Sequence, residues 1–193
     1  YIIEELKKDG YFYYDNDEQV VYLYCSAGNP STVYSDIEIG RKNVLFVPEN
    51  NVTIDNLGFF YTGAHAISAN PAVCDVKITN CEIAWIGGSS HMDTRFGNGI
   101  QFWNGCRNIE ISGCYIYQVF DAGITIQGDN LESVYKNIRV EKNLIEYCSW
   151  SFEWWSGYEN PYYYSLNLCD NGEIGNITVD SNIMRFEGRG WAL

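Results

Sequence analysis

A nine-residue unit occurs five times in this chain, from residue 51 onward. Its copies begin at Asn51, Asp75, Asn108, Asn137 and Asn176, and each alternates apolar with polar residues before a turn. The unit is constant while the segments between copies vary in length, which is how solenoid proteins look in sequence. Alternation with a period of two indicates strands with one buried face. We therefore expect successive copies to stack as parallel strands.

A second short strand follows the turn in every copy. These second strands are expected at residues 66–68, 99–102, 123–126, 151–154 and 190–193. Strand, turn, strand and loop then form the repeating element of the solenoid. Asn143 and Asn182 share one turn position, where stacked amides form hydrogen-bonded ladders. We expect such a ladder here.

The residues before the repeat have a different pattern. Residues 1–9 are expected to form a short helix that ends at Gly10, and residues 11–14 and 20–25 a β-hairpin across an acidic turn. Strands are also expected at 36–39 and 44–47. The predicted organisation is a leading segment over residues 1–35 and the stacked strands over residues 36–193.

The repeat resembles the right-handed parallel β-helix of the pectin-lyase-like superfamily over residues 36–193. The hairpin, together with the runs Gly97–Trp103, Gln118–Gly128 and Ser151–Trp155, resembles a glycosidase-like branch of that superfamily. The resemblance implies an all-β fold, a right-handed parallel β-helix (solenoid) with a short N-terminal helix and β-hairpin. It also implies activity on carbohydrates, because carboxylate-dependent glycosidases are among the families of this branch.

Composition restricts the partners. The chain has 25 Asp and Glu against 12 Lys and Arg, a net charge of −13, which repels nucleic acid and polyanionic glycans. Aromatic residues make up 16% and suit the flat faces of sugars. No apolar run is long enough to span a membrane. Because Tyr1 is not a Met and the chain stops in an apolar run at Leu193, we expect a fragment of a longer extracellular or periplasmic protein whose export signal is not among these residues.

The seven cysteines match no zinc or redox spacing. Cys81 and Cys114 occupy the same repeat position, and Cys74 and Cys106 lie close to a shared one. We favour stacked core residues over disulfides, although the spacing of neighbouring strands also allows the bonds.

Alternation along the second strands predicts one outward-facing strip. With Ile100, Ile124 and Phe152 pointing inward, the neighbouring positions of three successive copies point outward. This predicted strip consists of Gln101, Trp103, Thr125, Gln127, Glu153 and Trp155. Amides, a hydroxyl, a carboxylate and two indoles are what a sugar site uses. A solvated sheet face or a contact with a missing domain explains the same pattern.

Asp121 and Glu153 are the candidate catalytic residues. Glycoside hydrolysis needs two carboxyl groups roughly 5 to 10 Å apart, one protonated as the acid and one ionised as nucleophile or base. Neighbouring copies provide such a spacing. Trp154 and Trp155 would desolvate Glu153 and raise its pKa, making it the acid. The alternative for Asp121 is a turn cap that accepts hydrogen bonds from backbone amides.

A long insertion before Gly97 carries three further polar candidates, His91, Asp93 and Arg95. We expect His91 and Arg95 to help bind or position the substrate, with an ordinary polar loop as the alternative. These residues are too few for a metal site. His65 either lines the same groove or stabilises a turn, which is the default role.

The residues therefore predict a hydrolase that acts on a neutral or weakly acidic oligo- or polysaccharide and needs no cofactor. A polysaccharide lyase is a first alternative, and it requires a cation such as Arg, Lys or calcium to stabilise the enolate. A non-catalytic, adhesin-like glycan-binding protein is a second.

Overall fold

The computed structural model describes residues 3–91, 94–129, 133–156 and 173–188, in two compact units, Tyr1–Ile39 and Gly40–Leu193. In the first unit β1 (Phe12–Asp15) pairs antiparallel with β2 (Val20–Leu23), so the predicted hairpin is confirmed. The helix expected over residues 1–9 is only the 3-10 turn η1 (Ile3–Glu5), because so short a segment is marginal as a helix without packing. A four-residue helix, α1 (Pro30–Val33), follows the hairpin and is capped by the Asn29 side chain.

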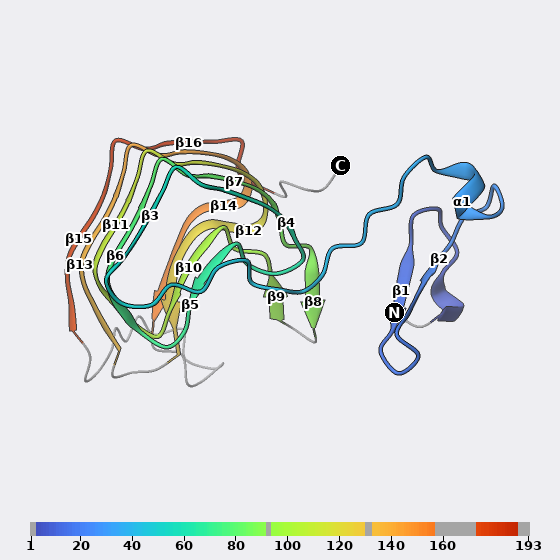
Figure 1. Ribbon diagram of the computed structural model, residues 1–193, viewed down its shortest axis with the longest axis horizontal. Coiled ribbons are helices and arrows are strands. Elements are labelled where there is room, and N and C mark those ends of the chain that lie inside the picture. Colours follow the sequence, from blue (N-terminus) through green and yellow to red (C-terminus); the bar gives the residue numbers. More distant parts are fainter. Residues whose placement is uncertain (1–2, 92–93, 130–132, 157–172, 189–193) are drawn as a thin grey trace. The chain divides into compact units, whose positions relative to one another are not determined.

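The second unit consists mainly of two parallel sheets (Figure 1). The first strands of the repeat copies form a five-stranded sheet in the order β15-β13-β11-β6-β3. Its members are β3 (Val52–Asp55), β6 (Val73–Thr79), β11 (Cys106–Ser112), β13 (Val134–Glu141) and β15 (Glu173–Asp180). Equivalent repeat positions pair, such as Ile109 with Ile138 and Val76. The predicted parallel pairing between successive copies is therefore present.

The remaining parallel strands form a seven-stranded sheet, in which β16-β14-β12-β10-β5 is the main path, β7 also pairs with β12, and β4 pairs with β7. Its members are β4 (Gly58–Thr62), β5 (Ile67–Ala69), β7 (Glu82–Ile86), β10 (Ile100–Trp103), β12 (Tyr115–Gly128), β14 (Leu144–Ser156) and β16 (Ile183–Arg185). The strands expected at 36–39 and 44–47 are absent, and Phe46 alone forms a bridge, with Ile67. Most apolar side chains of those two segments are exposed and have no core face to bury.

The predicted all-β right-handed parallel β-helix over residues 36–193 is wrong. The strands form several separate sheets, the parallel ones curl into a half-barrel, and helix makes up 4% of the chain. Parallel sheets are usual in α/β-type folds, so the arrangement is nearer to that type than to a single solenoid. The repeat determines which strands pair, but it does not determine how the paired sheets close around a core.

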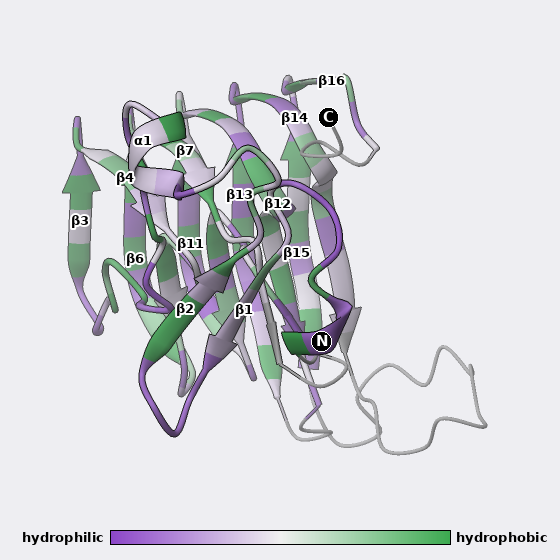
Figure 2. Cartoon of the chain, turned by 90° about the vertical axis from the view of Figure 1, so that its right-hand side faces the viewer, coloured by the Kyte–Doolittle hydropathy of each residue, from purple (hydrophilic) through white to green (hydrophobic). Residues whose placement is uncertain are grey.

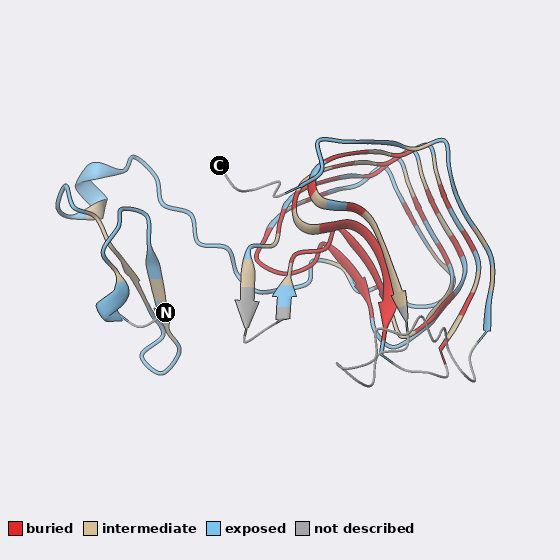
Figure 3. Cartoon of the chain, turned by 180° about the vertical axis from the view of Figure 1, so that it is seen from behind, coloured by how far each residue is buried: buried red, intermediate tan, exposed pale blue. Residues whose placement is uncertain are grey.

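The core lies between the two parallel sheets and is rich in isoleucine. Buried residues are concentrated in β5, β10 and the second half of β12 and in the inward-facing positions of the five-stranded sheet (Figure 3). Hydrophobic and hydrophilic residues alternate along strands of the five-stranded sheet such as β11 (Figure 2), which is why these strands bury one face. Phe102 and Ile124 are fully buried and lie directly beneath the predicted strip.

The predicted asparagine ladder is confirmed. Asn143 donates from Nδ2 to Asn182 Oδ1 at 2.9 Å and to the Ile111 carbonyl at 3.0 Å, and its Oδ1 accepts from the Cys114 amide at 2.9 Å. A second, exposed ladder runs from Asp75 through Asn108 and Asn137 to Asn176. Each residue of this second ladder has a positive φ, which asparagine and aspartate tolerate better than other residues with a side chain.

Replacing Asn143 by Ala should destabilise the protein by about 1–3 kcal/mol, because the buried Cys114 amide and Ile111 carbonyl each lose a partner. The measurement is urea unfolding followed by circular dichroism. The control is Asn176→Gly, which keeps the left-handed backbone and removes an exposed amide, and it should cost less than about 1 kcal/mol. Equal losses in the two variants would contradict a structural role for the buried ladder.

Six of the cysteines lie in the described residues, and all six are free. Cys81, Cys106 and Cys114 are buried in the core, as the stacked-residue hypothesis predicts. The hypothesis is wrong for Cys74, which is half-buried and pairs in register with Arg107 rather than with Cys106. Within the described part of the chain, no helix has the length and apolar character needed to cross a membrane.

Candidate functional site

The predicted strip lies on three neighbouring strands of the seven-stranded sheet. The registers of β10, β12 and β14 place Gln101 beside Thr125 and Thr125 beside Glu153. They also place Trp103 beside Gln127 and Gln127 beside Trp155. All six side chains therefore come together in two rows of three.

The prediction that the whole strip faces solvent is wrong for three of its polar residues. Gln101, Thr125 and Gln127 are buried, whereas Glu153 and the two tryptophans are half-buried. Gln127 Nε2 donates to Gln101 Oε1 at 3.2 Å, and Gln101 Nε2 donates to Ser68 Oγ at 3.1 Å. Alternation assigns a residue to a face of the sheet, but it does not show what covers that face. The two amides act as a hydrogen-bonded floor.

Glu153 is the carboxylate at the end of this floor. Its Oε2 accepts a hydrogen bond from Thr125 Oγ1 at 2.9 Å. Trp103 and Trp155 pack edge to face, with ring centroids 5.3 Å apart, at the row beside it. Trp154 faces the core and packs against Tyr135, so the prediction that it desolvates Glu153 is wrong. Residues 154 and 153 lie on opposite faces because successive side chains of a strand alternate.

Asp121 lies where the register between β12 and β14 shifts, between Val119 and Ala122. Its backbone amide donates to the Gly97 carbonyl at 3.0 Å, and its carboxylate Oδ1 lies 3.4 Å from Arg95 Nη2. Within the described residues the carboxylate contacts this guanidinium rather than a backbone amide. The turn-cap alternative for Asp121 therefore has no support in the geometry.

Arg95 is held by several groups around Asp121. Its Nη2 donates to the Phe120 carbonyl at 3.0 Å and to Ser149 Oγ at 3.3 Å, and its guanidinium lies 4.9 Å from the centre of the Phe120 ring. Ser149 Oγ donates to the same carbonyl at 2.7 Å. Arg95 belongs to β9 (Thr94–Phe96), which pairs antiparallel with β8 (Ser89–His91). The β8–β9 hairpin therefore places the Arg95 guanidinium beside Asp121, which lies 26 residues further along the chain.

The backbone of His91 pairs with Thr94 at the end of this hairpin, and Asp93 lies outside the described residues. The predicted binding role of His91 stays a prediction.

The two carboxyl groups influence each other. Burial raises the pKa of Glu153, the Thr125 hydrogen bond lowers it, the charge of Asp121 raises it and Arg95 lowers it. Burial also raises the pKa of Asp121, while Arg95 lowers it. Both shifts are upward, but only Asp121 forms an ion pair with Arg95. When the pair carries a single proton, that proton therefore belongs on Glu153.

Asn98 supports the backbone around Asp121, and sequence reasoning missed it. Its Oδ1 accepts from the Ala122 amide at 3.0 Å, and its Nδ2 donates to Gln101 Oε1 at 2.6 Å. Its backbone amide donates to His65 Nδ1 at 3.0 Å. Burial, followed by the charge of Lys42, lowers the pKa of His65 to about 4, so His65 is neutral and structural. In the sequence, the feature that could have identified Asn98 as a turn residue near the site is its position between Gly97 and Gly99.

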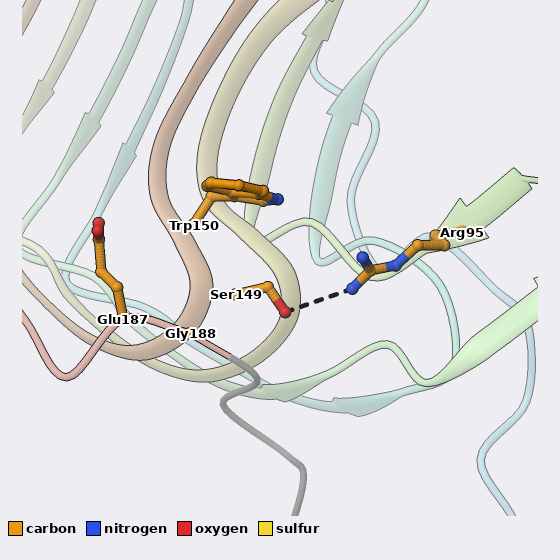
Figure 4. A pocket seen from close by; sticks show the side chains of 5 residues that line it. All are labelled: Arg95, Ser149, Trp150, Glu187 and Gly188. Atoms are coloured by element: carbon orange, nitrogen blue, oxygen red, sulfur yellow. Dashed lines mark hydrogen bonds between the residues drawn. The ribbon is translucent and has the colours of Figure 1, made fainter.

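An open pocket of about 500 Å³ lies beside Arg95, the partner of Asp121 (Figure 4). It is lined by Arg95, Ser149, Trp150, Glu187 and Gly188. The Trp150 side chain is exposed, and Glu187 Oε1 accepts from the Ser151 amide at 2.9 Å. Sequence reasoning missed Trp150 and Glu187 because both lie just outside the predicted second strands. The only signal was an indole in a polar context next to Ser149.

The described residues contain no group of three or more His, Cys, Asp or Glu side chains that could hold a metal ion. Comparisons with protein-family models, curated proteins and solved structures found no match.

Proposed function

We propose that the protein is a glycoside hydrolase that acts on a neutral or weakly acidic polysaccharide. The observation that carries the proposal is the pair Asp121 and Glu153. Both are partly buried carboxyls, the charge of Asp121 raises the pKa of Glu153, and only Asp121 forms an ion pair, with its Oδ1 at 3.4 Å from Arg95 Nη2. Such a pair divides the two roles, because Arg95 favours the ionised form of Asp121 while burial and the charge of Asp121 raise the pKa of Glu153, and glycoside hydrolysis needs one ionised and one protonated carboxyl group.

In this mechanism Glu153 donates its proton to the glycosidic oxygen as the bond to the anomeric carbon breaks. Asp121, kept ionised by Arg95, either attacks the anomeric carbon or removes a proton from the attacking water. The Thr125 hydroxyl donates to Oε2 of Glu153, and in this mechanism Oε1 carries the proton to the leaving group. Each group thereby has one fixed role at the start of the reaction.

The surrounding residues divide into positioning and binding groups. Gln101 and Gln127 are buried and bonded to one another, so they position the floor of the site rather than contact the sugar. Trp103 and Trp155 are half-buried and present indole surface beside Glu153. Such surface suits the apolar face of a pyranose ring. The proposal includes an extracellular or periplasmic location, where polymeric glycans are met.

The experiment incubates the full chain with neutral and uronate-containing polysaccharides, with and without calcium, and measures the release of reducing ends. The expected result is release of reducing ends without calcium and without an unsaturated product. A calcium-dependent rise in ultraviolet absorbance would replace the hydrolase by the lyase. Binding to a glycan with no cleavage of any kind would replace it by the non-catalytic alternative.

A further inference from the structure

Four aromatic side chains form an exposed row on the seven-stranded sheet, outside the candidate site. Tyr61 belongs to β4, Trp85 to β7 and Tyr147 to β14, and Phe186 follows β16 directly. They are between 37% and 64% exposed. We call this row the aromatic ridge.

The four residues occupy equivalent places in neighbouring strands. Their flanking positions pair, as in Phe60 with Ala84 and Glu146 with Arg185. All four have φ between 53° and 61°, and Gln118 of β12 has the same conformation at the position between Trp85 and Tyr147. Bulky residues rarely adopt this left-handed conformation. Here it makes a bend in each strand, with the ring projecting from the sheet.

The rings of the ridge are ordered against one another. Tyr61 and Trp85 stack with centroids 5.1 Å apart and planes 5° apart, and Tyr147 and Phe186 stack at 4.9 Å and 17°. Trp85 also meets the Tyr117 ring edge to face at 5.3 Å. Because the rings already pack against one another, they would lose little conformational entropy when a ligand binds.

The charged groups beside the ridge are Glu82, Glu146 and Arg185, and all three are already engaged, with the Arg185 guanidinium 5.3 Å from the centre of the Phe186 ring. Glu82 accepts from the Tyr117 hydroxyl at 2.9 Å. Glu146 accepts from the Tyr115 hydroxyl at 2.7 Å and from Arg185 Nε at 2.6 Å. With a net charge of −13 on the chain, this surface repels polyanions and anionic lipid headgroups. An uncharged ligand with flat apolar faces and hydroxyl groups fits it better.

We infer that the aromatic ridge binds an uncharged polysaccharide, as a site separate from the catalytic pair; the choice of a glycan rests on the proposed function. The ridge is continuous with the candidate site along the chain. Tyr147 lies three residues before Trp150, and Phe186 directly precedes Glu187, so β14 and the segment after β16 each lead from the ridge to the pocket beside Arg95. A long polysaccharide chain held on the ridge therefore extends toward Asp121 and Glu153.

The test measures binding of cellulose, xylan, mannan and starch, each as polymer and as short oligomer, by the full chain carrying Glu153→Gln, so that no turnover occurs. Trp85→Asn in the same background removes the indole, and Asn tolerates the left-handed backbone. We expect at least one of the polymers to bind the parent more tightly than its oligomers do. Trp85→Asn should weaken that binding about tenfold, the loss typical of an aromatic anchor.

Two controls accompany this variant. Trp85→Tyr keeps an aromatic ring and should retain most of the binding. Phe12→Asn removes an exposed aromatic of the hairpin in the other unit and should leave the binding unchanged. If Trp85→Asn alters thermal unfolding, Tyr147→Asn provides the same test at the other stacked pair of the ridge.

Equal affinity of Trp85→Asn and its parent for every polymer overturns the inference, as does a lack of binding to all four. A molar mass in light scattering that halves in Trp85→Asn also overturns it, because the ridge would then bind a second copy of the chain. The two proposals fail separately. If the protein binds a polymer through the ridge but hydrolyses nothing, the ridge inference stands and the hydrolase proposal fails. If it hydrolyses a glycan and Trp85→Asn leaves binding unchanged, the hydrolase proposal stands and the ridge inference fails.

Discussion

Glu153→Gln is expected to lower kcat/KM for a natural glycan by about 10²–10⁴-fold, the usual contribution of a positioned general acid. The glutamine keeps an oxygen that accepts from Thr125 and cannot give a proton to the glycosidic oxygen. For an aryl glycoside with a nitrophenolate leaving group, the loss should be much smaller, because that leaving group departs without protonation. The measurement is steady-state kinetics on the two substrates.

Asp121→Asn separates the two roles. It removes the nucleophile or base, so the loss should be equally large for both substrates. Glu141→Gln, which changes a carboxylate of the five-stranded sheet paired with Arg139, is the control and should leave both rates unchanged. A Glu153→Gln variant that loses the same factor on both substrates would contradict the acid role of Glu153.

The same assignment predicts the pH profile. Protonated Glu153 is the active form, and activity falls as the pH rises through its pKa. Burial and the charge of Asp121 raise that pKa, so the alkaline limb of kcat/KM should lie above the pH at which an ordinary glutamate ionises. Glu153→Gln should lack this limb.

Phe102→Ala is expected to destabilise the protein by about 3–5 kcal/mol, through lost burial and the cavity left behind. Phe102 is fully buried beneath Gln101 and Trp103, in the strand that pairs with both β5 and β12. Urea unfolding gives the free energy change. The control is Phe12→Ala on the hairpin, where the ring is exposed and the change should stay within about 0.5 kcal/mol. A loss below about 1 kcal/mol in Phe102→Ala would mean that the two sheets do not share one packed core.

The pairing of strands was predictable because it depends on a local pattern. A unit such as 108–116 alternates apolar and polar residues, and equivalent apolar positions must meet for the core to remain continuous. The same reasoning placed Asn143 beside Asn182 correctly. Closure of the sheets is not a local property, so the predicted single solenoid over residues 36–193 was wrong. The expected strands at 36–39 and 44–47 failed because an apolar run does not reveal whether a partner strand is available.

The rows of the candidate site were predictable for the same reason, and their burial was not. Gln101 and Gln127 alternate with core residues, which shows that they share one face of the sheet. The hydrogen bond between their side chains depends on how β10 and β12 pair in space, and the sequence alone does not show it. The contact between Arg95 and Asp121 depends on the β8–β9 hairpin and on the register shift of β12. Neither feature has a sequence signature of its own. Trp150 was missed because it lies in the stretch between two predicted strands.

The most direct test is the pKa of Glu153, measured by carbon-13 NMR titration of its carboxyl group in the unchanged protein and in Asp121→Asn. The variant removes a neighbouring negative charge and frees Arg95, and both changes favour the ionised form of Glu153. The predicted result is a Glu153 pKa above the ordinary value in the unchanged protein and a clearly lower one in Asp121→Asn. The same pKa in the two proteins would contradict a coupled carboxylate pair.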